Sequence, residues 1–139
     1  MYKLIVDHIL MELLEGWPHF LGGSQRFGFN TKDSDYDIFI LDPNNTFKVP
    51  GWADDTYNGF GPYDDESVTI YKYMVGNNHI HFIVMRREEI FDEIKRDHDL
   101  IAENMTDELR RVVREMPVSG VTKYRVLLKL AKEIRISQF

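Results

Sequence analysis

The chain has 139 residues, of which 43% are hydrophobic, so we expect one globular domain with a buried core rather than a disordered chain. It has no cysteine, which excludes disulfides, thiolate zinc sites and thiol nucleophiles. The formal net charge of −6 argues against nonspecific nucleic-acid binding by the chain as a whole. No apolar run approaches the length of a membrane span and no signal peptide is recognised, so we expect a cytoplasmic protein without a membrane partner.

The N-terminal half of the chain predicts one helix followed by strands. Residues 3–15 place apolar side chains at helical spacing, and Gly16 and Pro18 stop the pattern. Runs of apolar, β-branched and aromatic side chains predict strands over residues 19–21, 36–41, 68–75 and 79–85. The turn signal at residues 76–78 joins the last two strands in an expected hairpin.

The C-terminal third of the chain is predicted to be helical. Apolar side chains recur at helical spacing over residues 87–97, 106–116 and 121–136. Thr106 is an expected N-cap, and Pro117 ends the helix that it begins. The order of elements predicts an α+β fold, with helices packed on one face of a mixed or antiparallel sheet of about four strands. We expect residues 1–98 to form the core and residues 99–139 a helical extension packed on the same single domain.

The segment of about 25 residues from 42 to 66 is rich in Pro, Gly, Asn and Asp and is predicted to be a loop. Loops of this length are uncommon in compact domains and are often functional. Its acidic side chains either supply a carboxylate to a nearby site or are simply hydrated: Asp54, Asp55, Asp64, Asp65 and Glu66. Its aromatic side chains either stack on a base or anchor the loop on the sheet: Trp52, Tyr57, Phe60 and Tyr63.

Two aspartates mark the start of the strand predicted over residues 36–41. Asp35 and Asp37 are two residues apart, so their side chains lie on the same face of a strand, with Cα atoms about 7 Å apart. Two carboxylates on one face repel each other, and a hard cation such as Mg²⁺ is their usual stabilising partner. Upstream, Gly23 and Ser24 follow a short strand, where backbone N–H groups and a hydroxyl suit a phosphate. Together these residues predict a site for a metal-bound nucleotide.

The pair Gly23-Ser24, ten intervening residues and Asp35-Tyr36-Asp37 resemble the motif of the nucleotidyltransferase superfamily, which has the DNA polymerase β-like fold. The chain looks like a small, minimal member, and the resemblance extends over about residues 3–90. It implies transfer of a nucleoside monophosphate, AMP from ATP or another NTP, to an acceptor hydroxyl with release of pyrophosphate. It implies Mg²⁺ or Mn²⁺ bound by the catalytic residues Asp35 and Asp37, and a triphosphate bound by Gly23 and Ser24.

Basic side chains near the motif are candidates for nucleotide binding. Arg26 follows the Gly-Ser pair and Lys32 precedes the aspartates, and each either binds a phosphate oxygen or lies on the surface. Arg86 and Arg87, at the end of the last predicted strand, are weaker candidates because they also suit an exposed helix start.

The third carboxylate of the family is missing at the matching position, where His81 stands in a predicted strand. A histidine here is a general base for the acceptor hydroxyl, a third metal ligand, although Mg²⁺ prefers oxygen, or a structural residue of the strand. His79 lies on the same strand face and is either a ligand or a structural residue. The missing acid also supports an alternative, a degenerate nucleotidyltransferase-fold module that binds nucleotide or a protein partner without turnover.

The sequence leaves the acceptor open between a protein, an RNA and a small molecule. In so small a chain, the acceptor site is completed by a protein partner, by a homo-oligomer or by the C-terminal helices. Residues 117–139 hold five basic residues and one acid, in an otherwise acidic chain. This segment is either a solvated helix face or a contact for nucleic acid, whose binding would weaken steeply with salt.

Overall fold

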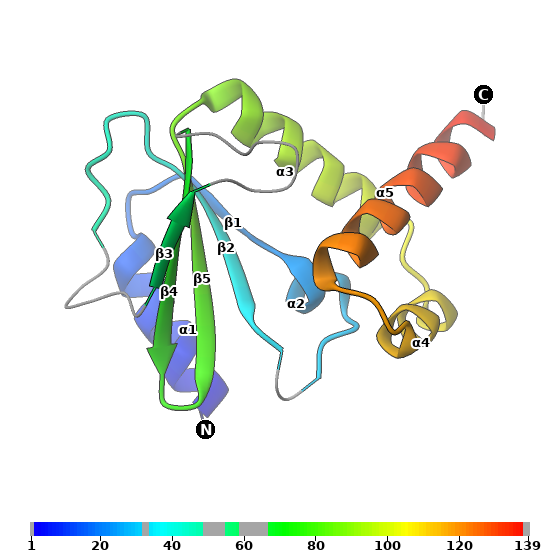
Figure 1. Cartoon of the computed structure of the whole chain (residues 1–139), viewed down its shortest axis with the longest axis horizontal. Coiled ribbons are helices and arrows are strands. Elements are labelled where there is room, and N and C mark those ends of the chain that lie inside the picture. Colours follow the sequence, from blue (N-terminus) through cyan, green and yellow to red (C-terminus); the bar gives the residue numbers. More distant parts are fainter. Residues whose placement is uncertain (1, 32–33, 49–54, 59–66, 138–139) are drawn as a thin grey trace.

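The computed structural model describes residues 2–31, 34–48, 55–58 and 67–137, which form an α+β fold with a mixed sheet (Figure 1). The strands lie in the spatial order β1 (His19–Gly22), β2 (Tyr36–Leu41), β5 (Asn78–Met85), β4 (Val68–Val75) and β3 (Asp55–Asn58). The helices are α1 (Tyr2–Leu14), α2 (Gly23–Phe27), α3 (Glu88–Glu103), α4 (Asp107–Glu115) and α5 (Gly120–Ser137). The predicted fold class, with its mixed sheet and C-terminal helices, is therefore confirmed.

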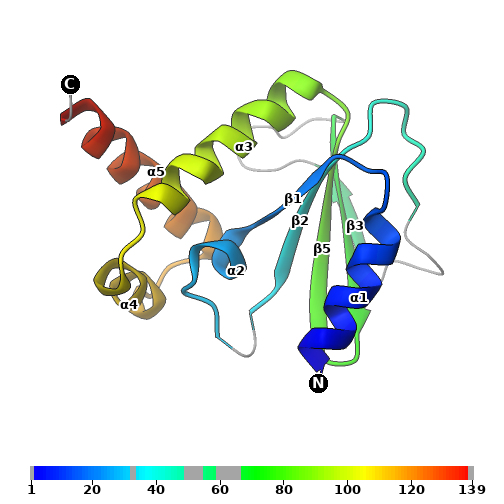
Figure 2. The same cartoon turned by 180° about the vertical axis from the view of Figure 1, so that it is seen from behind.

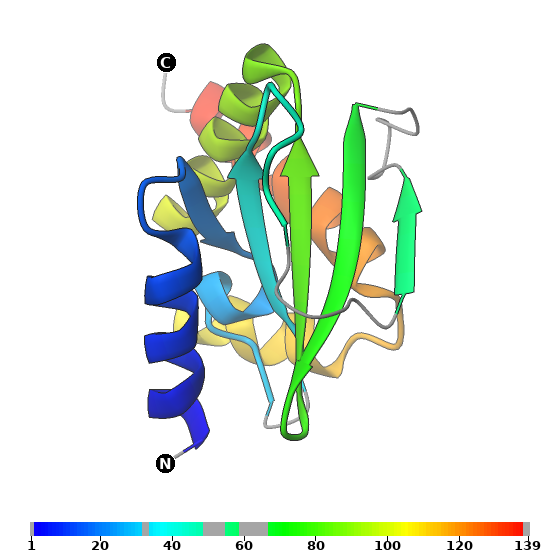
Figure 3. The ribbon, with the colours of Figure 1, turned by 90° about the vertical axis from the view of Figure 1, so that its left-hand side faces the viewer.

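Strand pairing brings Asp37 of β2 and His81 of β5 together. Strands β2 and β5 are parallel, whereas every other pair of neighbours in the sheet is antiparallel. Figure 3 shows β2 next to β5, although more than 30 residues separate them in the chain. The register sets Asp37 beside His81 on β5 and opposite Gly22 on β1. The expected hairpin of β4 and β5 is also confirmed.

Helices cover both faces of the sheet, whereas the sequence predicted helices on one face. Helix α1 packs on one face, and α2, α3 and α5 lie on the other (Figure 1 and Figure 2). In β2, Ile38 and Ile40 are buried against α1, while Phe39 is buried on the face of α3. A strand that is apolar on both faces needs cover on both, as parallel strands in a sheet interior usually do.

The C-terminal helices share a small core with α2. Leu127 and Ala131 of α5 are buried with Phe27 of α2 and Ile101 of α3. Helix α3 continues to Glu103, beyond its predicted end at residue 97, because Ile101 extends its buried stripe. The boundary predicted between residues 98 and 99 therefore lies inside this helix. None of the helices in the described part of the chain is both long and apolar enough to cross a membrane.

The segment predicted as one long loop, residues 42–66, contains a turn and a strand. The buried carboxylate of Asp42 accepts hydrogen bonds from the backbone N–H groups of Thr46 and Phe47, at 3.0 and 2.9 Å, and so fixes the first turn. Strand β3 pairs with β4 at the edge of the sheet. The other acidic and aromatic candidates of this segment lie outside the described residues: Trp52, Asp54, Phe60, Tyr63, Asp64, Asp65 and Glu66.

Candidate functional site

A cavity of about 530 Å³ lies between the sheet and the beginning of α5. Its floor is formed by β2, β4 and β5, and its walls by α2 with the segment that follows it, by α3 and by the start of α5. The volume falls within the range of ordinary small-molecule sites. One end of the cavity is polar and contains Ser24, Asp35, Asp37 and His81. Residues predicted from two separate stretches of sequence therefore border one cavity.

The imidazole ring of His81 lies between the carboxylates of Asp35 and Asp37. Its Nδ1 is 3.3 Å from Oδ1 of Asp37, and its Nε2 is 3.6 Å from Oδ2 of Asp35. The parallel register of β2 and β5 explains this position, because Asp37 and His81 are paired residues on the same face of the sheet. The two predicted aspartates thus converge on the histidine that replaces the third acid.

The pKa of His81 is raised above its usual value, chiefly by the hydrogen bond to the carboxylate of Asp37. The negative charges of Asp37 and Asp35 act in the same direction, while burial and the nearby charge of Lys72 lower the pKa of His81. A raised pKa in the folded state means that protonated His81 stabilises the fold below about pH 6.5. That contribution is lost as the pH rises through the folded-state pKa.

Replacing Asp37 with asparagine should lower the pKa of His81, because asparagine removes both the charge and the strongest acceptor beside the ring. A pH titration of the His81 ring resonances by NMR measures the change. The matched variant Asp92→Asn, at an exposed position of α3, should leave the titration of His81 unchanged. An unaltered titration in Asp37→Asn would show that the carboxylate does not raise the pKa of His81.

Gly23 is required at the junction between β1 and α2. Its φ angle is +63°, in the left-handed region that strains other residues. A Cβ atom at this position would also overlap Oδ2 of Asp37. Glycine therefore lets the backbone pass directly beside the Asp37 carboxylate, and the next residue, Ser24, borders the cavity.

The variant Gly23→Ala should displace the Asp37 carboxylate and destabilise the fold by at least about 1 kcal/mol, the cost of a left-handed alanine. Urea denaturation measures this loss. The variant Gly120→Ala is the matched control, because nothing lies within 4 Å of a Cβ there and no left-handed φ is present. Equal stability of Gly23→Ala and wild type would contradict this interpretation of the junction.

Of the basic residues predicted to bind phosphate, Arg26 and Arg86 contact other side chains of the protein. Arg26 of α2 forms an ion pair with Asp99 of α3, and it does not border the cavity. Arg86 donates hydrogen bonds to the side chains of Asn45 and Thr69, at 3.1 and 2.9 Å. Lys32 lies outside the described residues. Binding of a phosphate by Arg26 or Lys32 therefore stays a prediction, and for Arg26 it requires release from Asp99.

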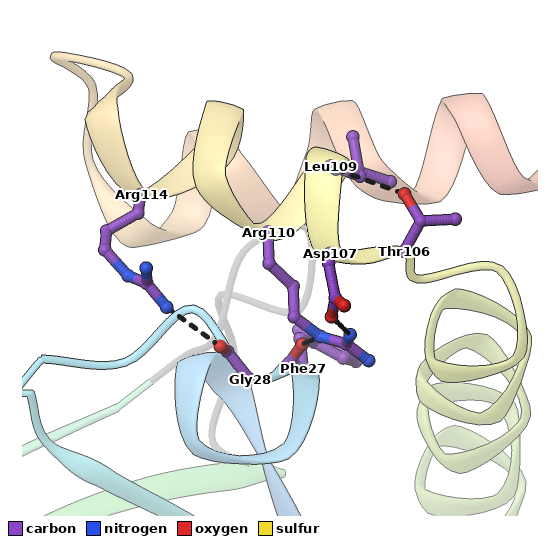
Figure 4. A network of polar contacts seen from close by, with 7 residues as sticks. All are labelled: Phe27, Gly28, Thr106, Asp107, Leu109, Arg110 and Arg114. Atoms are coloured by element: carbon purple, nitrogen blue, oxygen red, sulfur yellow. Dashed lines mark hydrogen bonds and ion pairs between the residues drawn. The ribbon is translucent and has the colours of Figure 1, made fainter.

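Two basic side chains that the motif did not indicate also border the cavity: Arg114 of α4 and Lys123 of α5. Arg114 donates to the carbonyl oxygen of Phe29 at 3.2 Å. It also donates to that of Gly28 at 3.1 Å, and Arg110 donates to that of Phe27 at 2.9 Å (Figure 4). Helix α4 thereby fixes the backbone that follows α2. Only the basic composition of residues 117–139 pointed to Lys123, and no sequence signal pointed to Arg114, because its role depends on a distant turn.

His98 of α3 also borders the cavity, and the sequence analysis did not identify it. It is 1% exposed, and its ring lies among Phe27, Phe39 and Tyr124. Burial lowers the pKa of His98 to about 4, so its ring is neutral at pH 7. The signal that could have found it is its spacing of four residues from Ile94, on the buried stripe of α3.

The carboxylates of Asp35 and Asp37 fit a cation that takes most of its ligands from elsewhere. Mg²⁺ is commonly bound by one or two carboxylates, with water and substrate phosphates completing its shell. Among the residues that the structure describes, no group of three or more His, Asp or Glu side chains is arranged to hold a metal ion. Two carboxylates alone do not complete the shell of such an ion.

Comparisons with protein-family models, with curated proteins and with solved structures found no match. A functional assignment of this chain therefore depends on the residues and geometry of the cavity.

Proposed function

We propose that the chain is a metal-dependent nucleotidyltransferase that moves AMP from ATP to an acceptor hydroxyl and releases pyrophosphate. The observation that carries this proposal is that Ser24, Asp35 and Asp37 border one cavity, with both carboxylates directed to the same imidazole ring. The resemblance of the Gly-Ser and Asp-x-Asp motifs to the nucleotidyltransferase superfamily supports the same assignment.

In the proposed reaction, the residues at the polar end of the cavity have separate roles. The hydroxyl of Ser24 would donate a hydrogen bond to the triphosphate, which Gly23 allows to approach the backbone closely. Asp35 and Asp37 would hold Mg²⁺ or Mn²⁺, which supplies positive charge to the phosphate oxygens. Positioning and charge neutralisation provide most of the rate enhancement in reactions of this type.

His81 would accept the proton of the acceptor hydroxyl. As the hydroxyl oxygen forms its bond to the α-phosphorus, the bond from phosphorus to the bridging oxygen breaks and pyrophosphate leaves with its electron pair. The proton passes to the neutral ring of His81. Because the pKa of His81 is raised, the neutral form that acts as a base grows with rising pH, and so does the expected rate.

Arg114 and Lys123 also border the cavity and bring positive charge to it. The ammonium of Lys123 lies 5.6 Å from the ring centre of Phe29 and 3.4 Å from the carbonyl oxygen of Arg114. A nucleotide in this cavity would meet positive charge from these side chains as well as from the metal. This arrangement favours a polyphosphate over a neutral ligand.

The position of His81 also favours a second candidate function. When protonated, its ring is itself a cation between the carboxylates of Asp35 and Asp37, at 3.3 and 3.6 Å. Such an internal cation would take over the role of the metal and leave a module that binds nucleotide or a protein partner without turnover. The raised pKa of His81 supports this alternative at the lower end of the physiological pH range.

Labelling with ATP that carries a radioactive α-phosphate tests the proposal. The protein is incubated with this ATP, Mg²⁺ or Mn²⁺ and a cell extract, between pH 7 and 9, and the labelled molecule is identified. We expect an acceptor that is labelled by wild type and by the exposed control Asp92→Asn, but not by Asp35→Asn. ATP binding without labelling at every pH would identify the non-catalytic module. Labelling by His81→Asp alone would show that the native chain lost its activity with the third acid.

A further inference from the structure

Helix α5 has one buried side and one exposed side. Leu127 and Ala131, each 2% exposed, pack with residues of α2 and α3 and so fix the orientation of the helix about its axis. From its first turn, which borders the cavity, the helix runs outward to the C-terminal end of the chain (Figure 1). The side that faces away from the packing is therefore available for contacts along about 27 Å, the length of 18 helical residues.

Three basic side chains form a row on the exposed side of α5, which we call the basic stripe: Arg125, Lys129 and Lys132. They follow one another at intervals of four and three residues, so they are neighbours on one face of the helix. Val121, four residues before Arg125, lies on the same face and borders the cavity. The basic stripe therefore begins one turn of helix beyond the cavity.

No carboxylate neutralises the basic stripe at ion-pair distance in the part of the chain that the structure describes. Glu133 is the single acidic residue of α5, and it forms no ion pair with Lys129, four residues before it. Burial raises the pKa of Asp97 on α3, and the charge of Lys132 offsets part of this rise. The basic stripe thus keeps positive charge that an anion outside the chain can balance.

The spacing of these charges is unfavourable for the isolated helix. Arg125 and Lys129, and then Lys129 and Lys132, are like charges at four and three residues, and such pairs repel each other. The exposed side of α3 instead combines both signs at this spacing, as in Asp92 and Arg96. Mixed signs are typical of a hydrated helix surface, whereas a row of one sign suits a ligand with a row of opposite charges.

We propose that the basic stripe binds a single RNA strand, whose end enters the cavity. The distance along the helix from Arg125 to Lys132 is about 10 Å, and charges along a stacked strand are about 3.4 Å apart, so about three nucleotides cover the basic stripe. The next nucleotide would then lie beside Val121, at the edge of the cavity. The role of this RNA end as the acceptor rests on the proposed function, whereas binding of the strand to α5 does not.

An RNA strand fits the basic stripe better than a membrane or a mononucleotide does. A helix that binds a membrane inserts its apolar side, but the apolar side of α5, with Leu127 and Ala131, is already buried in the protein. A mononucleotide is too short to contact the first and the last cation together. RNA is commonly recognised at single-stranded ends, and its 3′ end carries hydroxyls of the kind that the proposed transfer requires.

Binding of a fluorescent single-stranded RNA of about ten nucleotides, without ATP or metal, tests the basic stripe. Three phosphate contacts predict a slope of about −2 for the logarithm of the affinity against that of the salt concentration. The affinity should therefore fall about 20-fold between 50 and 200 mM salt. The triple variant Arg125→Gln, Lys129→Gln and Lys132→Gln should bind at least about tenfold more weakly at 50 mM salt and lose most of the slope.

A second triple variant is the matched control, because it also replaces two lysines and one arginine at exposed positions: Lys48→Gln, Lys95→Gln and Arg96→Gln. It should bind the RNA as tightly as wild type. Equal affinities of the two triple variants, or an affinity of wild type that does not depend on salt, would overturn the proposal. Equally tight binding of polyglutamate, or of vesicles that contain phosphatidylserine, would also overturn it, because any anionic surface would then be enough.

The substitutions in α5 face solvent and relieve repulsion between like charges, so that variant should unfold at the same temperature as wild type or higher. Changes in the amide resonances of residues 121–132 of wild type, when RNA is added, locate the strand without any variant. Changes confined to other parts of the chain would contradict binding at the basic stripe.

Labelling with α-labelled ATP in the cell extract separates this inference from the proposed function. A label that ribonuclease removes, and that the α5 variant fails to add, would support both. A labelled protein or small molecule, with no binding of RNA to α5, would support the transferase and overturn the RNA surface. RNA binding at α5 without any labelled acceptor would support the RNA surface and reject the transferase.

Discussion

The variant Asp37→Asn is expected to lower the rate of AMP transfer by about 100- to 1,000-fold, the usual effect of losing one group that stabilises charge at a phosphoryl-type site. The asparagine has nearly the same shape, so the fold should be kept. It removes one of two carboxylates for the metal and the partner that positions His81 at 3.3 Å. Initial rates of transfer from α-labelled ATP, measured against the acceptor found in the extract, give the factor.

The exposed variant Asp92→Asn controls for a general effect of removing one negative charge, and it should keep the wild-type rate. The account also expects the residual activity of Asp37→Asn to lose its rise with pH, because His81 no longer has the carboxylate that raises its pKa. An Asp37→Asn protein with more than a tenth of wild-type activity would show that this carboxylate does not take part.

The second large effect concerns stability in acid and depends on His98. Its pKa is about 4 in the folded protein, against 6.5 for an ordinary histidine, because its ring is buried. Between pH 6.5 and pH 4 the unfolded chain therefore binds a proton that the folded chain excludes, and stability falls as the pH is lowered. The shift corresponds to a loss of about 3 kcal/mol in the free energy of unfolding across this window.

Replacing His98 with phenylalanine removes the titrating group, so that variant should lose about 3 kcal/mol less stability than wild type between pH 6.5 and pH 4. Urea denaturation at several pH values measures both curves. Carboxylates contribute equally to the two proteins, so the difference isolates His98. The exposed replacement His8→Phe should give a curve parallel to wild type. Parallel curves for His98→Phe and wild type would contradict the neutral, buried state of this ring.

Elements with a strong repeating pattern could be predicted from sequence. The bounds of β2 and β4 agree with the predictions, since Tyr36–Leu41 and Val68–Val75 are rich in apolar, aromatic and β-branched residues. The N-cap at Thr106 is confirmed, and its hydroxyl oxygen accepts a hydrogen bond from the backbone N–H of Leu109 at 3.1 Å. Such features depend on residues that are close together in the chain, so a single sequence is enough to predict them.

Features that depend on packing could not be predicted in the same way. Helix α2 has five residues, too few for an apolar period, and its position comes from the burial of Phe27 under α5. The parallel pairing of β2 and β5 crosses more than 30 residues of chain, and no local pattern records it. The packing of helices on both faces of the sheet could not be predicted for the same reason. Strand β2 becomes an interior strand only when β5 lies beside it.

The acidic half of the candidate site was predicted, and its aromatic half was not. The spacing of Gly23-Ser24 and Asp35-Tyr36-Asp37 is a local motif, and the structure brings those residues to one cavity. His98 is an ordinary member of an amphipathic stripe by sequence. It borders the cavity only because the fold sets α3 against β2. A single sequence does not show which histidine on the buried face of a helix will border a cavity.

The central claim is that Asp35 and Asp37 bind a divalent cation together with a nucleotide triphosphate. Titration of Mn²⁺ followed by electron paramagnetic resonance, with and without an ATP analogue that cannot be cleaved at the α-phosphate, tests it directly. The account predicts weak binding of Mn²⁺ alone, tighter binding when the analogue is present, and at least a tenfold loss of the latter in Asp35→Asn. The same Mn²⁺ affinity in wild type and Asp35→Asn, with the analogue present, would contradict it.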